Sequence, residues 1–139
     1  MFYRPEEGSP LERDPFNAIV VPQPIGWIST LDAEGRANLA PYSFFNAVAY
    51  DPPQVMFAAT TNHAFGGLKD SVKNARETGE FVVNLATWTL REQMNASAVP
   101  APHEVDEFEY AGLEKAPSEL VKPYRVAESP VQLECVYAR

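Results

Sequence analysis

Prolines divide most of this chain into short segments, and this feature limits its possible folds more than any other. The chain has 13 prolines among 139 residues. Many of them stand where an apolar stretch begins or ends: Pro22, Pro24, Pro41, Pro52, Pro53, Pro100 and Pro102. Because proline lacks an amide hydrogen and interrupts helices and central strands, this spacing predicts short strands separated by turns.

The stretches between the prolines have the residue types of β-strands. Residues 24–31, PIGWISTL, are rich in β-branched and aromatic residues and predict one strand. The turn signal at 32–35 leads into a second strand, which continues from Asn38 to Phe45. Residues 54–60, QVMFAAT, are apolar at both alternating positions and predict a strand that is covered on both faces. Further strands are predicted at 80–86 and in the terminal stretch SPVQLECVY.

Two helices are predicted among these strands. Leu68, Val72 and Ala75 follow helical spacing, and Gly79 is placed to end the helix, with Asp70 as its N-cap. Residues 89–92, TLRE, match a capping box for a second, short helix that carries Leu90 and Met94 on one face. Residues 1–15 are predicted as an irregular arm and residues 98–107 as an irregular loop.

These elements predict a mainly β fold, a small β-barrel with a few inserted helices in one domain over residues 1–139. The last predicted strand ends just before Arg139. A barrel that stops there exposes an unpaired strand edge, which a partner chain or further strands have to cover. We favour the second explanation, an incomplete barrel whose closing strands are absent from this chain.

The net charge of −8 at pH 7 excludes several classes of protein. Nucleic-acid binders and proteins of anionic membranes need a basic surface. No apolar run is long enough to span a bilayer, and the polar, acidic start of the chain does not resemble a signal peptide. The single cysteine, Cys135, rules out a disulfide within the chain. These features predict a cytoplasmic protein.

Several kinds of catalytic site have no counterpart in the sequence. It contains neither a G-x-S-x-G elbow nor a Cys-x-x-Cys pair nor a complete phosphate loop. His63 and His103 are far apart in the chain and lack helical ligand spacing, so we predict no metal site. No pair of carboxylates stands out as an acid and base.

Two strand segments carry side chains suited to a flat heterocycle. Trp27, Ser29 and Thr30 could offer a stacking surface and hydrogen bonds, although residue types alone favour a core tryptophan with the two hydroxyls on the exposed side. The second segment holds Ser43, Asn46 and Ala47. An asparagine beside small residues can read a ring with mixed polar edges, whereas the structural alternative is an Asn-capped turn after a buried Phe pair.

A third segment suits a phosphate. Thr60 and Thr61 are followed by Gly66 and Gly67, and then by Lys69 and Ser71 at the start of a predicted helix. Free amides and the positive end of the dipole make a helix start favourable for anions. A capped helix with a solvated lysine is the alternative. Together the three segments describe a ligand with a flat ring and a phosphate, which both FMN and pyridoxal phosphate satisfy.

The same motifs resemble those of a known family. The run PIGWIST…GRANLAPYSFFNAVAYDPPQVMF, the segment KDSVKNARETGEFVVNLA and the later DEFEYAGLEKAP and ESPVQLEC are similar to flavin reductase-like, FMN-binding split-barrel proteins. The resemblance covers nearly all of the chain from about Pro22. It implies a split β-barrel that forms a homodimer, with FMN near the interface between subunits.

The resemblance also implies roles for individual residues. Trp27, Ser29 and Thr30 would lie beside the flavin, Ser43, Asn46 and Ala47 would meet its ring, and Thr60, Thr61, Lys69 and Ser71 would hold its phosphate end. His103 lies in a loop where relatives place a ring-proximal residue. No catalytic side chain is implied, because the flavin carries the redox chemistry.

The function that the resemblance implies is an oxidoreductase that passes hydride from NAD(P)H to flavin or to another acceptor. A non-catalytic FMN-binding electron carrier and a pyridoxamine-phosphate-oxidase-like enzyme are the alternatives. The last would need more arginine near its phosphate than residues 60–75 supply. The sequence departs from the family in having Gln23 where relatives often have arginine, and relatives continue beyond the end of this chain.

Overall fold

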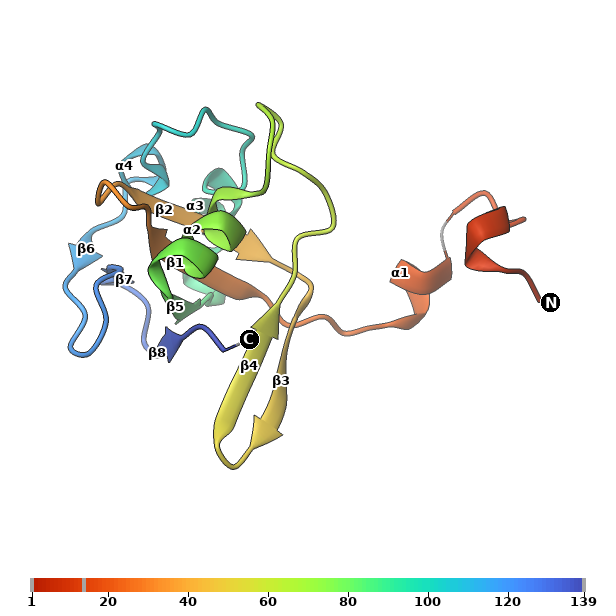
Figure 1. The fold of residues 1–139 in the computed structure, drawn as a ribbon, viewed down its shortest axis with the longest axis horizontal. Helices are drawn as coiled ribbons and strands as arrows, with labels where there is room; N and C mark the ends of the chain where they lie inside the picture. The colour runs from red at the N-terminus through yellow and green to blue at the C-terminus, as the bar shows by residue number, and fades with distance from the viewer. Residues whose placement is uncertain (1, 14, 139) are drawn as a thin grey trace.

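The computed structural model describes residues 2–13 and 15–138, and within them the regular structure is mainly β with a few short helices (Figure 1). The strands are β1 (Gly26–Leu31), β2 (Ala37–Tyr42), β3 (Phe45–Tyr50), β4 (Pro53–Phe57), β5 (Glu80–Leu85), β6 (Lys115–Ala116), β7 (Arg125–Val126) and β8 (Gln132–Val136). The α-helices are α1 (Pro15–Ile19), α2 (Asp70–Thr78), α3 (Arg91–Ala96) and α4 (Glu107–Ala111), and the 3₁₀ helices are η1 (Pro5–Glu7) and η2 (Trp88–Leu90). The predicted mainly β fold with inserted helices is confirmed.

The central sheet has four antiparallel strands in the order β2-β1-β5-β8. Strand β1 lies between β2 and β5, so that Ser29 is the register partner of both Leu39 and Val82. Residues 26–30 of β1 are all buried, which agrees with the unbroken run of apolar and small residues in its sequence. Strands β2 and β8 are the edges of this sheet within the described part of the chain.

Each face of the sheet carries its own hydrophobic core. Trp27 and Ile28 are consecutive in β1 and therefore point to opposite faces. The core on the Trp27 face contains Trp27, Leu39, Leu90, Phe108, Leu113 and Val126. The core on the Ile28 face contains Ile28, Tyr42, Ala75, Phe81 and Val83. Helices α3 and α4 cover the first face, and α2 covers the second.

The strand predicted from Asn38 to Phe45 is in fact two strands. Strand β2 ends at Tyr42, a bend follows, and Phe45 begins β3, which turns back to pair with β4 as a separate hairpin. Phe45 packs directly over Gly26, where a Cβ atom would lie 2.5 Å from the phenyl ring. The glycine therefore leaves room for the change of direction.

The β3–β4 hairpin extends away from the sheet, and only its base joins the core (Figure 1). Phe45, Val55 and Phe57 pack against the core of the Ile28 face, and the Phe57 ring centroid lies 5.1 Å from that of Tyr42. Gln54 and Met56, on the alternate face of β4, are exposed. The prediction that this strand is covered on both faces is therefore wrong for the chain by itself.

Helix α2 occupies the predicted position and ends as predicted. Gly79 follows its last residue with φ of 80°, in the left-handed region, and its amide donates to the Ala75 carbonyl. The prediction of Asp70 as the N-cap is wrong. Lys69 occupies that position, and the Asp70 carboxylate contacts two histidines instead.

The predicted capping box at residues 89–92 is also absent. Leu90 is the N-cap of α3, and the Thr89 hydroxyl is bonded to that of Thr87 at 2.9 Å. The predicted apolar face is nevertheless confirmed, because Leu90 and Met94 both pack into the core of the Trp27 face.

The segments predicted as irregular contain short helices. The N-terminal arm, whose residues 1 and 14 lie outside the described residues, contains η1 and leads into α1, away from the sheet (Figure 1). The loop predicted at 98–107 ends where α4 begins, and α4 buries Phe108 against the sheet. Over residues 2–13 and 15–138, no helix has the length and apolar character needed to cross a membrane.

Candidate functional site

A cleft of about 460 Å³ opens beside α2. Its lining residues are Phe57, Ala58, Ala59, Thr60, Thr61, Asn62, Leu68, Lys69, Val72 and Arg76. They come from the segment between β4 and α2 and from one face of α2, because Lys69, Val72 and Arg76 are spaced three and four residues apart. The end of β4, the following loop and one face of α2, from its N-cap Lys69 to Arg76 in its last turn, thus meet at one opening.

The lining of this cleft is suited to an anionic organic ligand. Lys69 and Arg76 supply two positive charges, and no carboxylate is among the lining residues. Thr60 and Thr61 supply hydroxyl groups, and the start of α2 adds the positive end of its dipole. Phe57 and other apolar side chains form the rest of the wall. A phosphate attached to an apolar group fits this set of donors.

The structure brings together three of the four residues predicted for the phosphate end. Thr60, Thr61 and Lys69 all line the cleft. Ser71 does not, because its hydroxyl is buried and donates to Asn38 Oδ1 at 2.7 Å. Arg76 was missed by the sequence reasoning, which considered only residues 60–75, although its position seven residues after Lys69 places it on the same helix face.

Trp27, Ser29 and Thr30 are completely buried within the protein. The Trp27 indole donates to Ser97 Oγ at 2.9 Å, and the Ser29 hydroxyl donates to the Tyr124 carbonyl at 2.6 Å. Thr30 Oγ1 accepts from Asn74 Nδ2 at 3.1 Å. These side chains are engaged inside the fold, and their contact with a flavin stays a prediction.

Ser43, Asn46 and Ala47 are exposed at the start of the hairpin. Asn46 Oδ1 accepts from the Ala47 amide at 2.9 Å. Asn46 follows Phe45 in β3, and the register partner of Phe45 is Phe57, which lines the cleft. The three residues are exposed but are not among the cleft-lining residues, and their contact with a flavin ring stays a prediction.

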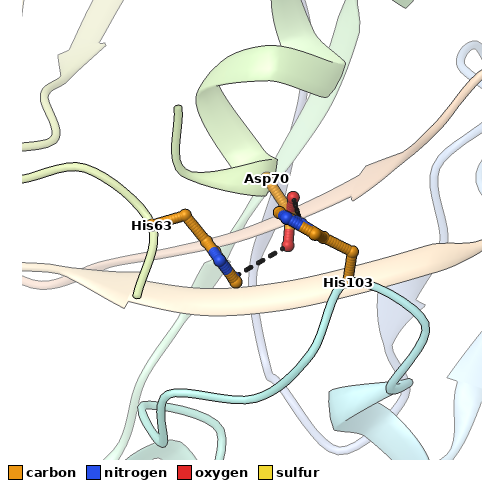
Figure 2. A group of neighbouring side chains, drawn as sticks. All are labelled: His63, Asp70 and His103. Atoms are coloured by element: carbon orange, nitrogen blue, oxygen red, sulfur yellow. Dashed lines mark hydrogen bonds and ion pairs between the residues drawn. The ribbon is translucent and has the colours of Figure 1, made fainter. Parts of the chain in front are cut away.

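His63 and His103 meet at Asp70, although they are far apart in the sequence (Figure 2). His63 Nε2 lies 3.3 Å from Asp70 Oδ2, and His103 Nδ1 lies 2.6 Å from Asp70 Oδ1. The two rings stack with centroids 4.1 Å apart. Sequence separation was therefore a poor guide to their distance, because a loop and the start of α2 carry both partners to His103.

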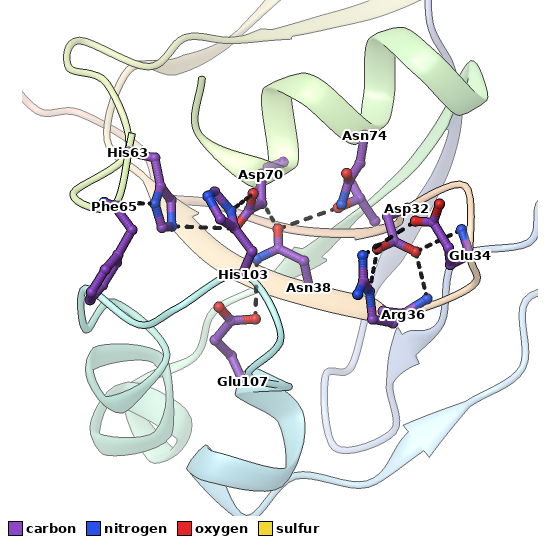
Figure 3. Close-up of polar contacts among 12 residues, drawn as sticks. Asp32, Glu34, Arg36, Asn38, His63, Phe65, Asp70, Asn74, His103 and Glu107 are labelled. Atoms are coloured by element: carbon purple, nitrogen blue, oxygen red, sulfur yellow. Dashed lines mark hydrogen bonds and ion pairs between the residues drawn. The ribbon is translucent and has the colours of Figure 1, made fainter. Parts of the chain in front are cut away.

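A buried polar network adjoins this cluster (Figure 3). Glu107 accepts from Asn38 Nδ2 at 3.1 Å and from the Leu39 amide at 3.0 Å. Burial raises the pKa of the Glu107 carboxyl above its ordinary value, although these hydrogen bonds oppose the rise. A small cavity of about 120 Å³ is lined by Asn38 and Glu107 of this network and by His63, and Lys69 lines both this cavity and the larger cleft.

Comparison with known proteins identifies the family of this chain. The profile of the family described as "Flavin reductase like domain" matches residues 18–139. The chain belongs to this family. The resemblance seen in the motifs is thereby confirmed, and so is its flavin reductase-like fold.

The relatives include one curated protein and two crystal structures. An uncharacterized protein from Aquifex aeolicus is 45% identical over 117 residues, which cover 84% of this chain and 59% of that protein. Nitrilotriacetate monooxygenase component B from Bacillus cereus is 32% identical with a TM-score of 0.88, over 100% of this chain and 68% of that one. The 2-nitrobenzoate 2-nitroreductase of Pseudomonas fluorescens is 31% identical with a TM-score of 0.77, over 89% of this chain and 58% of that one. The chain spans little more than half the length of the curated relatives it matches.

Proposed function

We propose that this chain binds FMN and acts in an oxidoreductase that passes hydride from NAD(P)H to the flavin or onward to another acceptor. The observation that carries this proposal is the cleft beside α2, where Lys69 and Arg76 face an opening without any carboxylate in its lining. Membership of the flavin reductase-like family supports flavin as the ligand. The names of two relatives, a monooxygenase component and a nitroreductase, are consistent with redox chemistry.

Each part of the cleft has a role in this proposal. Lys69 and Arg76 would neutralise the phosphate, and the hydroxyls of Thr60 and Thr61 would donate to its oxygens. Phe57 and its apolar neighbours would exclude water beside the ribityl chain. A bound flavin would supply the hydride chemistry, and the protein would supply orientation and electrostatics.

The residues predicted to lie at the flavin ring form an exposed group and a buried group. Ser43, Asn46 and Ala47 are exposed and would contact the isoalloxazine directly. Trp27, Ser29 and Thr30 are buried in the central strand and would support the flavin site from inside the protein, and their contact with the flavin stays a prediction. We also propose a cytoplasmic protein with a single domain of the split-barrel type.

We propose that the protein is a homodimer, and the β3–β4 hairpin supports this. A two-stranded hairpin alone is at best marginally stable in water. Val48 and Tyr50, beyond the base of the hairpin, are 56% and 93% exposed, and Met56, near the base but on the alternate face from Phe57, is 44% exposed. A second copy of the chain would cover them and would bring the flavin site next to the interface.

The experiment that tests the proposed function is the visible absorption spectrum of the protein after addition of FMN and desalting, followed by NADH and NADPH oxidation. A retained flavin band with turnover supports the oxidoreductase. A retained band without turnover favours the electron carrier, and retention of pyridoxal phosphate in place of FMN favours the third alternative. The comparison of FMN with pyridoxal phosphate is needed because Arg76 lines the cleft. The lack of arginine in residues 60–75 had argued against the pyridoxamine-phosphate-oxidase-like alternative.

The variant Lys69→Gln makes the test specific to the cleft. Lys73→Gln is the matched control, since Lys73 is exposed on the same helix but does not line the cleft. We expect the first substitution to weaken FMN retention and the second to leave it unchanged. Equal retention in both variants would contradict the assignment of this cleft.

A further inference from the structure

We propose that His63, Asp70 and His103 form a binding site for one divalent transition-metal ion, with Zn²⁺ as the best-suited cation. Each residue offers one ligand atom, and these three atoms all lie within 4.8 Å of one another. Two imidazoles and one carboxylate are a recurring ligand set for first-row transition metals. This inference is independent of the proposed flavin function.

One distance in the cluster already matches the separation of two zinc ligands, and the other has to lengthen. Ligand atoms about 2.0 to 2.2 Å from a tetrahedral zinc ion lie roughly 3.4 Å from one another. His63 Nε2 is already 3.3 Å from Asp70 Oδ2, and His103 Nδ1 is 2.6 Å from Asp70 Oδ1. Figure 2 shows the three side chains gathered at one point, and a side-chain rotation that moves His103 away from Asp70 would open a position for a cation between them.

The surroundings leave room for a further ligand. His63 and Asp70 line the cavity of about 120 Å³, which is large enough for water molecules. The side chains of His63 and Asp70 are 9% and 14% exposed, whereas that of His103 is 43% exposed. A cation would thus be held by two sheltered ligands and closed from the solvent side by His103, with water in the fourth position.

Metal binding has to change the tautomer of both histidines. His63 Nδ1 accepts from the Phe65 amide at 3.1 Å, so its proton is on Nε2 and points to Asp70. His103 directs Nδ1 to the same carboxylate, so its proton is on Nδ1. A metal at these two nitrogens moves the proton of each ring to its other nitrogen. His63 then loses its bond to Phe65, which the neighbouring Gly66 and Gly67 allow by their flexible backbone.

The chain is well suited to a direct test, because it has two histidines and both are in this cluster. We expect one equivalent of Zn²⁺ to shift the ¹⁵N resonances of both rings to the opposite tautomer. One equivalent of Co²⁺ should produce visible d–d absorption bands. If neither ring responds to excess Zn²⁺, the proposal is overturned, and this outcome does not depend on any variant folding correctly.

Substitutions show which side chains bind the ion. His103→Gln should weaken Co²⁺ binding by at least about tenfold, as the loss of one ligand group implies. The control Glu104→Gln removes an exposed carboxylate next to His103 and should leave the affinity unchanged. Burial raises the pKa of the Cys135 thiol to about 11, which makes it a poor ligand, and Cys135→Ser should retain the Co²⁺ bands. Undiminished binding by folded His103→Gln would overturn the proposal.

Discussion

Arg76 is the side chain through which the flavin proposal can be tested at the scale of one residue. Arg76→Gln removes a charge from the cleft lining without deleting the bulk of the side chain. A hydrogen bond to a charged group contributes about 1.5 to 3 kcal/mol, so FMN affinity should fall by roughly ten- to a hundredfold. Fluorescence titration of FMN measures this change.

The comparison variant is Arg76→Lys, which keeps the charge but not the planar pair of donors. We expect it to lose less affinity than Arg76→Gln. If both substitutions leave the dissociation constant of FMN unchanged, the phosphate is bound elsewhere and Arg76 is only a neighbour of the opening.

Glu107 gives a second residue-scale prediction, which concerns pH. Burial raises the pKa of its carboxyl above the ordinary value of 4.5, so the folded protein favours the protonated form. The resulting stability is fully present below the unfolded pKa and is lost as pH rises through the raised folded pKa. Glu107→Gln keeps an acceptor for Asn38 and Leu39 but cannot ionise.

The wild type should lose stability as pH rises above about 4.5, whereas the Gln variant should not. We therefore expect the free energy of unfolding of the Gln variant to increase relative to that of the wild type over this pH range. Urea denaturation at a series of pH values measures the difference. A difference that does not depend on pH would show that ionisation of Glu107 is not coupled to folding.

Residue types alone predicted which side chains gather at the cleft better than they predicted buried contacts. Thr60, Thr61 and Lys69 were recognisable because hydroxyls and a cation before a helix form a local pattern. Trp27 and Ser29 belong to a pattern that fits both a ligand surface and a core, and only their partners, Ser97 and Tyr124, decide where the side chains point. Those partners are distant in sequence, so no local rule predicts them.

At the scale of elements, the packing of Phe45 over Gly26 joins the hairpin to the central sheet. A Cβ atom at position 26 would lie 2.5 and 2.6 Å from two ring atoms of Phe45. Gly26→Ala should therefore destabilise the fold by about 1 to 3 kcal/mol, as overpacking of a core does. The midpoint of chemical denaturation measures this loss.

A double-mutant cycle separates this contact from a general effect of alanine in a strand. In a Phe45→Ala background the ring is gone, so Gly26→Ala should cost less than in the wild type. An equal cost in both backgrounds would mean that the two residues are not coupled.

The strength of the local sequence pattern explains which strands and helices were predictable. The strand β1 and helix α2 followed clear local patterns, and their positions agree closely with prediction. The boundary between β2 and β3 was missed because both strands are apolar and the bend at Ser43 and Phe44 has no proline or glycine. Helix α4 was missed although Asp106 caps it, since its five residues are too few for a periodic signal.

At the scale of the whole molecule, the exposed hairpin predicts how the protein assembles. Val48 is 56% exposed on β3, and a second subunit covering the hairpin would bury it. A charge placed in such an apolar interface loses its hydration without gaining a partner. Val48→Glu should therefore convert a dimer into a monomer, which sedimentation velocity measures directly.

Leu120→Glu is the matched control, because Leu120 is 87% exposed but lies in the loop between β6 and β7 rather than on the hairpin. It should leave the sedimentation coefficient of the dimer unchanged. A wild-type chain that remains monomeric at high concentration, or a Val48→Glu variant that remains dimeric, would contradict assembly through this hairpin. Since FMN is proposed to lie near the interface, the monomeric variant should also retain less flavin after desalting. This loss would connect the oligomeric state of the molecule to the cleft beside α2.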